Sequence, residues 1–119
     1  MDKRKELGDT SEQLARRYLE RRGYQLVEAN FHCKWGEIDL ILKKGQNLVF
    51  AEVRSRSNLC CGTPAESVNE KKQAKLRKAA QYYLYCHPEL EQYYCRFDVV
   101  SVVWKEGRAQ IAWLADAFQ

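Results

Sequence analysis

Residues 36–54 read GEIDLILKKGQNLVFAEVR, and this stretch decides the fold. Two apolar, β-rich runs, 36–42 and 48–54, lie on either side of a polar segment, 43–47, that contains a glycine. Short apolar runs joined by such a turn are typical of a β-hairpin. The run 36–42 has apolar side chains at neighbouring positions, so it predicts a central strand that is covered on both faces.

Helical and strand patterns follow one another on both sides of this hairpin. Residues 9–22 have apolar side chains at helical spacing, with Asp9 and Glu12 placed as in a capping box and Gly23 after the last turn. Residues 65–86 are also predicted as a helix, which stops at His87 and Pro88. The other predicted segments are strands at 24–29, 96–104 and 109–114, a bend at 30–35 and a loop at 55–64. The order α-β-β-β-α-β-β predicts an α/β fold with a mixed central sheet flanked by helices, in a single domain over 1–119.

The composition excludes several classes of protein. No apolar run approaches the ~18 residues of a membrane span, and the N-terminus leads into polar residues, so we expect a protein that is neither exported nor bound to a membrane. The 5 cysteines are odd in number and lack a C-x-x-C pair, which fits reduced cytoplasmic thiols better than disulfides or a zinc site. The formal net charge of +4 suits a polyanionic partner without identifying one.

The hairpin brings two acidic residues together. Residues that face each other across a symmetric hairpin have a constant sum of their numbers, so a turn centred between Gly45 and Gln46 places Asp39 opposite Glu52. Opposed side chains have Cβ atoms ~4.5–5.5 Å apart, and two carboxylates at that distance repel unless a cation neutralises them. Mg²⁺ is usually bound by one or two carboxylates together with waters and phosphate oxygens. Asp39 and Glu52 are therefore candidate magnesium ligands.

A different register would remove this pair. A turn shifted by one residue would send Asp39 and Glu52 to opposite faces, where Asp39 would cap a strand or pair with a lysine. Burial favours the paired arrangement, because both acids interrupt apolar strands, in which an unpaired charge is costly. Glu37 is interpreted as a structural partner of Arg54 across the hairpin.

Basic residues near the two acids are candidates for holding a phosphate. Arg54 follows Glu52 by two residues, so both lie on one face of the strand, ~6.6 Å apart. A guanidinium keeps its proton, so Arg54 cannot act as a base, but it can stabilise negative charge in a transition state. Lys72 lies on the apolar stripe of helix 65–86, so it either reaches the hairpin or extends to water.

Other side chains have two uses that the sequence does not separate. Lys71, Lys75, Arg77 and Lys78 form a basic helix face that either water or a nucleic-acid backbone would cover. Trp35, Tyr93 and Tyr94 either pack in the core, which is the commoner use, or stack on exposed bases. His32 and His87 show no partner spacing.

Several blocks of the sequence together resemble the bacterial YraN-like family. They are GEIDLI at 36–41, LVFAEVRSR at 48–56, RFDVV at 96–100, and the single residues Gly62, Pro64, Val68 and Lys72. The resemblance covers nearly the whole chain. That family is similar to the restriction-endonuclease-like (PD-(D/E)XK) superfamily, and in layout to archaeal Holliday junction resolvases. The resemblance therefore implies a restriction-endonuclease-like αβββαβ core.

The resemblance also implies roles for individual residues. Asp39 and Glu52 take the places of the ligands for Mg²⁺, with Mn²⁺ as a substitute, and Arg54 takes the place of the superfamily's lysine. Glu12 takes the place of a helical glutamate, although completing a capping box with Asp9 explains it equally well. Lys72, Arg56 and Lys75 are the expected substrate-binding residues.

Two functions follow as expectations. The first is a cytoplasmic, Mg²⁺-dependent endonuclease that hydrolyses phosphodiester bonds in branched or single-stranded DNA. The second is a nucleic-acid-binding adaptor of nuclease descent that no longer cuts, since Arg54 stands where a lysine is usual. A protein-interaction domain is a weaker third option. A homodimer is expected only by analogy with resolvases of similar layout.

Overall fold

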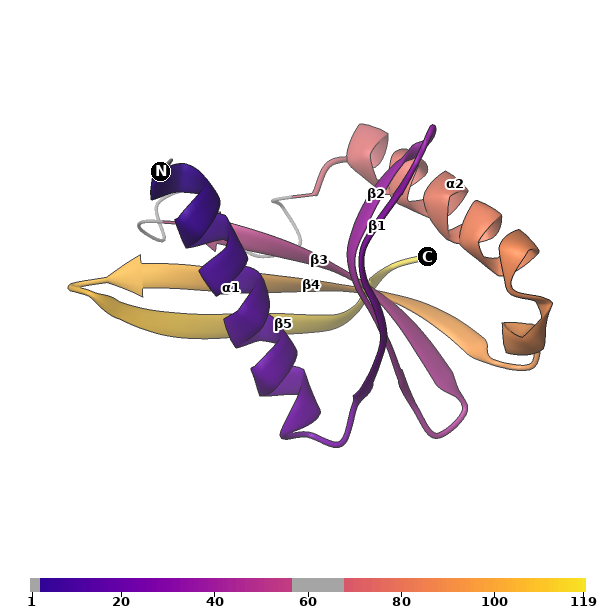
Figure 1. Cartoon of the computed structure of the whole chain (residues 1–119), viewed down its shortest axis with the longest axis horizontal. Helices are drawn as coiled ribbons and strands as arrows, with labels where there is room; N and C mark the ends of the chain where they lie inside the picture. Colours follow the sequence, from indigo (N-terminus) through magenta and orange to yellow (C-terminus); the bar gives the residue numbers. More distant parts are fainter. Residues whose placement is uncertain (1–2, 57–67) are drawn as a thin grey trace.

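The computed structural model describes residues 3–56 and 68–119, whose five strands form one mixed sheet (Figure 1). In chain order the elements are α1 (Lys3–Glu20), β1 (Gln25–Cys33), β2 (Gly36–Lys44), β3 (Asn47–Arg56), α2 (Glu70–Cys86), η2 (Pro88–Leu90), β4 (Tyr94–Lys105) and β5 (Arg108–Phe118). The strands follow one another across the sheet in the order of the sequence. Strands β3 and β4 are parallel and the other three neighbouring pairs are antiparallel. The predicted α/β class and the position of β2 between two strands are confirmed.

Each helix covers its own part of the sheet (Figure 1). Alternate side chains of a strand point to opposite faces, and those of β3 divide accordingly. Leu48 and Phe50 join the cluster around α2, whereas Val49 and Ala51 join the cluster around α1. β3 is thus buried on both faces, as expected for a strand at the centre of a sheet. Neither helix of the described chain is long and apolar enough to cross a membrane.

The first helix differs from its predicted bounds. It begins at Lys3, so Asp9 lies inside the helix and cannot be its N-cap. The capping-box interpretation of Asp9 and Glu12 was therefore wrong. The end is close to the prediction, since α1 stops at Glu20 and the Gly23 N–H donates to the Glu20 carbonyl at 3.0 Å. Gly23 has a φ of +93°, which a residue with a Cβ rarely adopts.

Local backbone features explain the other differences. The bend expected from Asn30 does not end β1, because Asn30 takes a φ of +55° and the strand continues to Cys33. The second helix begins only at Glu70, because the Asn69 side chain accepts a hydrogen bond from the Lys72 N–H at 2.9 Å and caps it. The expected stop at His87 and Pro88 is confirmed. Most of the predicted loop, with Cys60, Cys61, Gly62 and Pro64, lies outside the described residues, as does the predicted helical start at 65–67.

A buried ion pair holds β4 and β5 in place on the α1 side. Asp98 is 1% exposed, and its two oxygens accept four hydrogen bonds. Two come from the Arg96 guanidinium at 2.9 Å each, one from the Trp113 indole at 2.9 Å and one from the Asp116 N–H at 2.9 Å. Arg96 also donates to the Tyr24 hydroxyl at 2.8 Å, which connects the start of β1 to the same group. The hydrogen bonds to Asp98 raise the pKa of Arg96 above its already high ordinary value.

Removing this carboxylate is expected to destabilise the fold strongly. Asp98→Ala leaves the Arg96 charge and the Trp113 N–H buried without an acceptor, so the free energy of unfolding should fall by about 3–5 kcal/mol. Urea unfolding of both proteins measures the change. Arg16→Ala is the matched control, because Arg16 pairs with Glu20 on the exposed face of α1 and should cost less than about 0.5 kcal/mol. A loss below ~1 kcal/mol for Asp98→Ala would contradict the role of this pair.

Candidate active site

The hairpin of β2 and β3 has the register that the sequence predicts. Its ladder runs from Lys44 opposite Asn47 to Leu40 opposite Ala51, so two residues form the turn. Gly45, the first of them, has a φ of +60°, and glycine favours this conformation in tight hairpins. Beyond the last pair, the next residue of β2 is Asp39 and the next residue of β3 is Glu52.

At that position the backbone pairing gives way to a side chain. Asp39 Oδ2 accepts a hydrogen bond from the Val53 N–H at 2.8 Å, which takes the place of a further bond between the two strands. Ile38 and Ile41 are three residues apart, yet both join the α2-side cluster. A regular strand would direct them to opposite faces, so β2 must rotate between them, at Asp39. The positive φ of Asn30 lies at the corresponding place of the paired strand β1.

The Asp39 and Glu52 carboxyl groups lie close enough to share a proton. Burial is the main cause that raises the pKa of each of them. The negative charge of Asp39 adds to this effect and brings the pKa of Glu52 from its ordinary 4.5 to about 7. Because the two carboxyl groups affect each other's pKa, a proton between them belongs to the pair rather than to either residue.

Two cations approach the same oxygen of Glu52. Lys72 Nζ lies 3.6 Å and Arg54 Nε 3.8 Å from Glu52 Oε1. Both distances exceed those of a good hydrogen bond, so the contacts are charge interactions without close donation. The other oxygen, Oε2, is buried and has no hydrogen-bond partner within the described chain. Of the two alternatives for Lys72, the structure shows the one in which it reaches the hairpin, since its side chain approaches Glu52 and is 31% exposed.

These two acids fit a magnesium-type site better than a zinc-type site. No group of three or more His, Cys, Asp or Glu side chains suited to a metal occurs among the described side chains, those of 11–56 and 68–119. Structural zinc needs four such ligands, whereas Mg²⁺ needs only one or two carboxylates and completes its shell with water and phosphate oxygens. The buried Oε2 of Glu52 is an oxygen of the required kind.

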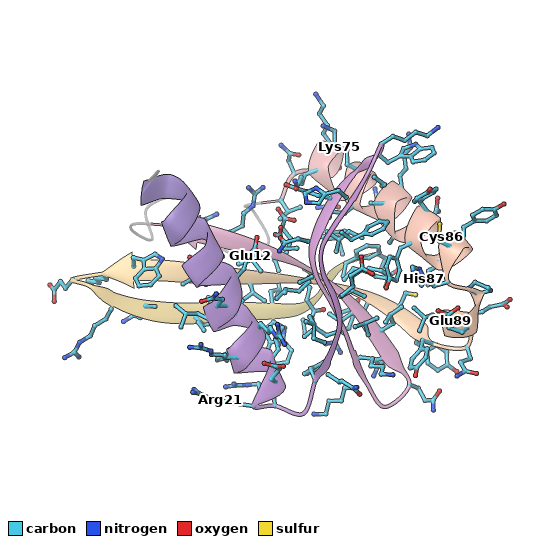
Figure 2. The ribbon with its side chains drawn as sticks, viewed as in Figure 1. Glu12, Arg21, Lys75, Cys86, His87 and Glu89 are labelled. Carbon is cyan, nitrogen blue, oxygen red and sulfur yellow. The ribbon has the colours of Figure 1, made fainter. Side chains whose placement is uncertain are left out.

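The remaining residues predicted for the site lie at different distances from it. Glu12 of α1, labelled in Figure 2, lines a cavity of about 380 Å³ together with Leu40 of β2, the residue that follows Asp39. Arg56 is half-buried on β3, two residues beyond Arg54 and hence on the same face. Lys75 is exposed at the tip of the β1–β2 pair, where it packs beside Gly36, so it is not grouped with the acids.

The role predicted for Glu37 was wrong. Glu37 does not pair with Arg54, because the ladder between β2 and β3 ends before reaching them. Instead Glu37 faces His32 across β1 and β2, with Oε2 3.2 Å from Nδ1 on an exposed surface. His87 also has a partner, since its Nδ1 lies 2.9 Å from the Tyr83 carbonyl oxygen and its ring stacks on Tyr83 at 4.0 Å.

Asp98 is the important buried acid that sequence reasoning did not single out. It belongs to the block RFDVV, where an acid interrupts an apolar strand just as Asp39 and Glu52 do. Arg96 stands two residues earlier on the same face, and this spacing is the available signal for a structural pair. Asp98 accepts four hydrogen bonds, whereas Glu52 Oε2 accepts none in the described chain, and this difference separates a structural acid from a candidate ligand.

The raised pKa of Glu52 predicts a loss of stability with rising pH. The folded state holds the proton more tightly than the unfolded state, so its advantage is complete below pH 4.5 and disappears as the pH passes about 7. The free energy of unfolding of the wild type should therefore fall between pH 5 and pH 8, relative to Glu52→Gln, by on the order of 2–3 kcal/mol. Urea unfolding in EDTA measures this difference, with Glu37→Gln as an exposed control. Equal pH dependence in wild type and Glu52→Gln would contradict the burial of a shared proton.

Comparison with known proteins identifies the family. The profile described as "Uncharacterised protein family UPF0102" matches residues 11–102. A UPF0102 protein of Nitrosococcus oceani is 45% identical over 94% of this chain and 90% of its own length. One from Caldicellulosiruptor bescii is 40% identical over 96% and 98%, and one from Desulforamulus reducens is 47% identical over 90% and 89%. The family resemblance deduced from the motifs is confirmed, and the chain belongs to the UPF0102 family.

Proposed function

We propose that this chain is a phosphodiesterase that cuts DNA and uses Mg²⁺ held by Asp39 and Glu52. The observation that carries the proposal is the buried pair of carboxyl groups, one with an oxygen that lacks a partner in the described chain, beside two cationic side chains. Two adjacent buried carboxyls need either a proton or a cation between them. A pKa of about 7 for Glu52 means that a divalent cation can displace the proton near neutral pH.

Side chains around the two acids would bind the substrate and stabilise the charge that develops on it. A bound Mg²⁺ polarises a phosphate and lowers the pKa of water, and Mn²⁺ prefers similar oxygen ligands. Lys72 and Arg54, which approach Glu52 in the absence of substrate, would bind the phosphate and stabilise the negative charge that develops on it. Arg54 stays protonated, so its role is electrostatic. Arg56, on the same face of β3 as Arg54, would bind the DNA backbone, and Glu12 of α1 would assist catalysis.

The first test is cleavage itself. Purified protein should nick branched or single-stranded DNA in Mg²⁺ or Mn²⁺ and not in EDTA, and Asp39→Ala should lower the rate by about 100-fold or more. Labelled oligonucleotides separated on denaturing gels give the rates. Glu37→Ala is the matched control, because Glu37 lies two residues away on the same strand and should leave the rate unchanged. Equal activity in wild type and Asp39→Ala would refute the proposal.

A second test locates the ion without requiring cleavage. At pH 8 a ligand at 100 times its dissociation constant stabilises the folded state by about 2.7 kcal/mol. The melting temperature of the wild type should therefore rise with Mg²⁺, and Glu52→Gln should remove most of the rise. Glu37→Gln should behave as the wild type does. A rise that is the same in all three proteins would place the ion elsewhere.

One outcome would favour the alternative function. Arg54 at a place where a lysine is usual in the superfamily is compatible with a chain that binds DNA and does not cut it. In that case the protein would bind DNA in EDTA, with an affinity that falls steeply with salt and survives Asp39→Ala, while no substrate is nicked. That combination would assign the chain as a nucleic-acid-binding adaptor.

A further inference from the structure

An exposed pair of aromatic rings lies where the β1–β2 tip meets α2. Trp35 is 36% exposed and Tyr82 is 40% exposed, and their ring centroids are 5.6 Å apart. Phe31 stacks on Tyr82 at 6.4 Å and contacts the buried Tyr83 edge to face at 4.9 Å. The outer rings thus rest on the core, which holds them in place while leaving part of their surface open. Large aromatic side chains exposed together are unusual enough to require an explanation.

Hollows border this pair on two sides. A groove of about 490 Å³ is lined by Trp35, Lys78, Gln81, Tyr82 and Tyr85. A second hollow of about 340 Å³ is lined by residues 32–35 of the β1–β2 tip together with Tyr82. Both rings belong to both linings, so flat ligands have space beside them. A planar, partly polar group such as a nucleobase fits an aromatic wall of this kind.

Lysines surround the rings and extend toward the candidate active site. Lys34 Nζ lies 4.3 Å from the centre of the Trp35 ring. On α2, Lys71, Lys75 and Lys78 are exposed at helical spacing, and Tyr82 continues the same face four residues later. The first of these lysines is the chain neighbour of Lys72, which contacts Glu52. Between Lys72 and Tyr82 the helix rises ~15 Å, which is the length of about four stacked nucleotides at ~3.4 Å each.

Exposed aromatic rings beside a row of lysines favour a nucleic acid over a protein as the partner of this surface. An apolar protein surface that covered the exposed rings would gain nothing from the row of lysines. A single DNA strand needs both, because its phosphates attract the lysines and its unpaired bases stack on the rings.

We infer that the exposed face of α2 and the β1–β2 tip form a binding track for single-stranded DNA, in which Trp35 and Tyr82 stack unpaired bases and Lys71, Lys75 and Lys78 bind the phosphates. This inference rests on the proposed function and adds to it a substrate class, a strand with unpaired bases beside the cleaved bond. A fully paired duplex keeps its bases stacked on each other and cannot use the rings.

Binding measured in EDTA tests this track separately from cleavage. The probe is a fluorescein-labelled 12-mer of oligo(dT), and anisotropy gives the dissociation constant. Trp35→Ala should weaken binding by about 5- to 100-fold, the loss expected for one stacked base. An abasic 12-mer keeps the phosphates and removes the bases, so it should bind the wild type at least as weakly as oligo(dT) binds the variant, because it loses stacking on both rings.

Matched variants control for folding and for general loss of aromatic surface. Tyr94→Ala removes a tyrosine that is 73% exposed at the start of β4, away from the lysine row, and should leave binding unchanged. Trp35→Phe keeps a ring and should recover most of the affinity. The comparison of oligo(dT) with the abasic probe on the wild type needs no variant, so it decides the matter even if Trp35→Ala fails to fold.

Three results would overturn the track. The first is equal affinity of the wild type for oligo(dT) and the abasic strand. The second is a duplex that loses as much affinity on Trp35→Ala as oligo(dT) does. The third is oligo(U) binding much more tightly than oligo(dT), which would assign the track to RNA. Failure of the proposed nuclease looks different, because Asp39→Ala and wild type would then behave alike in cleavage while stacking in EDTA stays intact.

Discussion

The two-residue turn at Gly45 and Gln46 fixes which residues of β2 and β3 lie side by side, and the candidate site depends on that register. With Leu40 opposite Ala51, the next position on each strand carries an acid. The strands part there, and the Asp39 carboxylate accepts the Val53 N–H at 2.8 Å. The same separation leaves a place beside Glu52 that Lys72 enters from α2 and Arg54 from β3. A register shifted by one residue would separate Asp39 from both Glu52 and the Val53 N–H.

The buried acids Asp98 and Glu52 differ in how fully their surroundings compensate their charge. Asp98 accepts four hydrogen bonds and stays fully compensated, which suits an element that holds β4, β5 and the start of β1 together. Glu52 is 5% exposed, and its Oε1 lies 3.6 Å from Lys72 Nζ and 3.8 Å from Arg54 Nε. Burial, followed by the charge of Asp39, raises its pKa to about 7. Incomplete compensation costs stability, and such positions are common where a protein binds a charged ligand. The contrast supports the assignment of Glu52 to the site and of Asp98 to the framework.

The sequence was sufficient for features set by local chemistry. The glycine turn and the alternation of β3 are properties of neighbouring residues, so the hairpin register could be predicted, whereas helical spacing left two alternatives open for Lys72. Features that depend on residues distant in the sequence could not be predicted. The partners of Asp98 are Arg96 on β4 and, on β5, the Trp113 side chain and the Asp116 backbone N–H. Nothing close to Asp98 in sequence indicates the two partners on β5. Asn30 was expected to end β1, but β1 continues to pair with β2 beyond it. The Asn69 cap makes α2 begin later than the apolar spacing indicated.

The parallel pairing of β3 with β4 has a consequence for how the chain acquires its structure. The β2–β3 ladder closes a loop of two residues, whereas the first parallel partners, Asn47 and Tyr94, are separated by the whole of α2. Closing the longer loop costs more entropy and gives slower folding, so the hairpin is expected to form first. The two acids would then meet while still hydrated, and their desolvation would come only when α2 docks. Ordering of the site is thereby a late event, tied to the final condensation of the core.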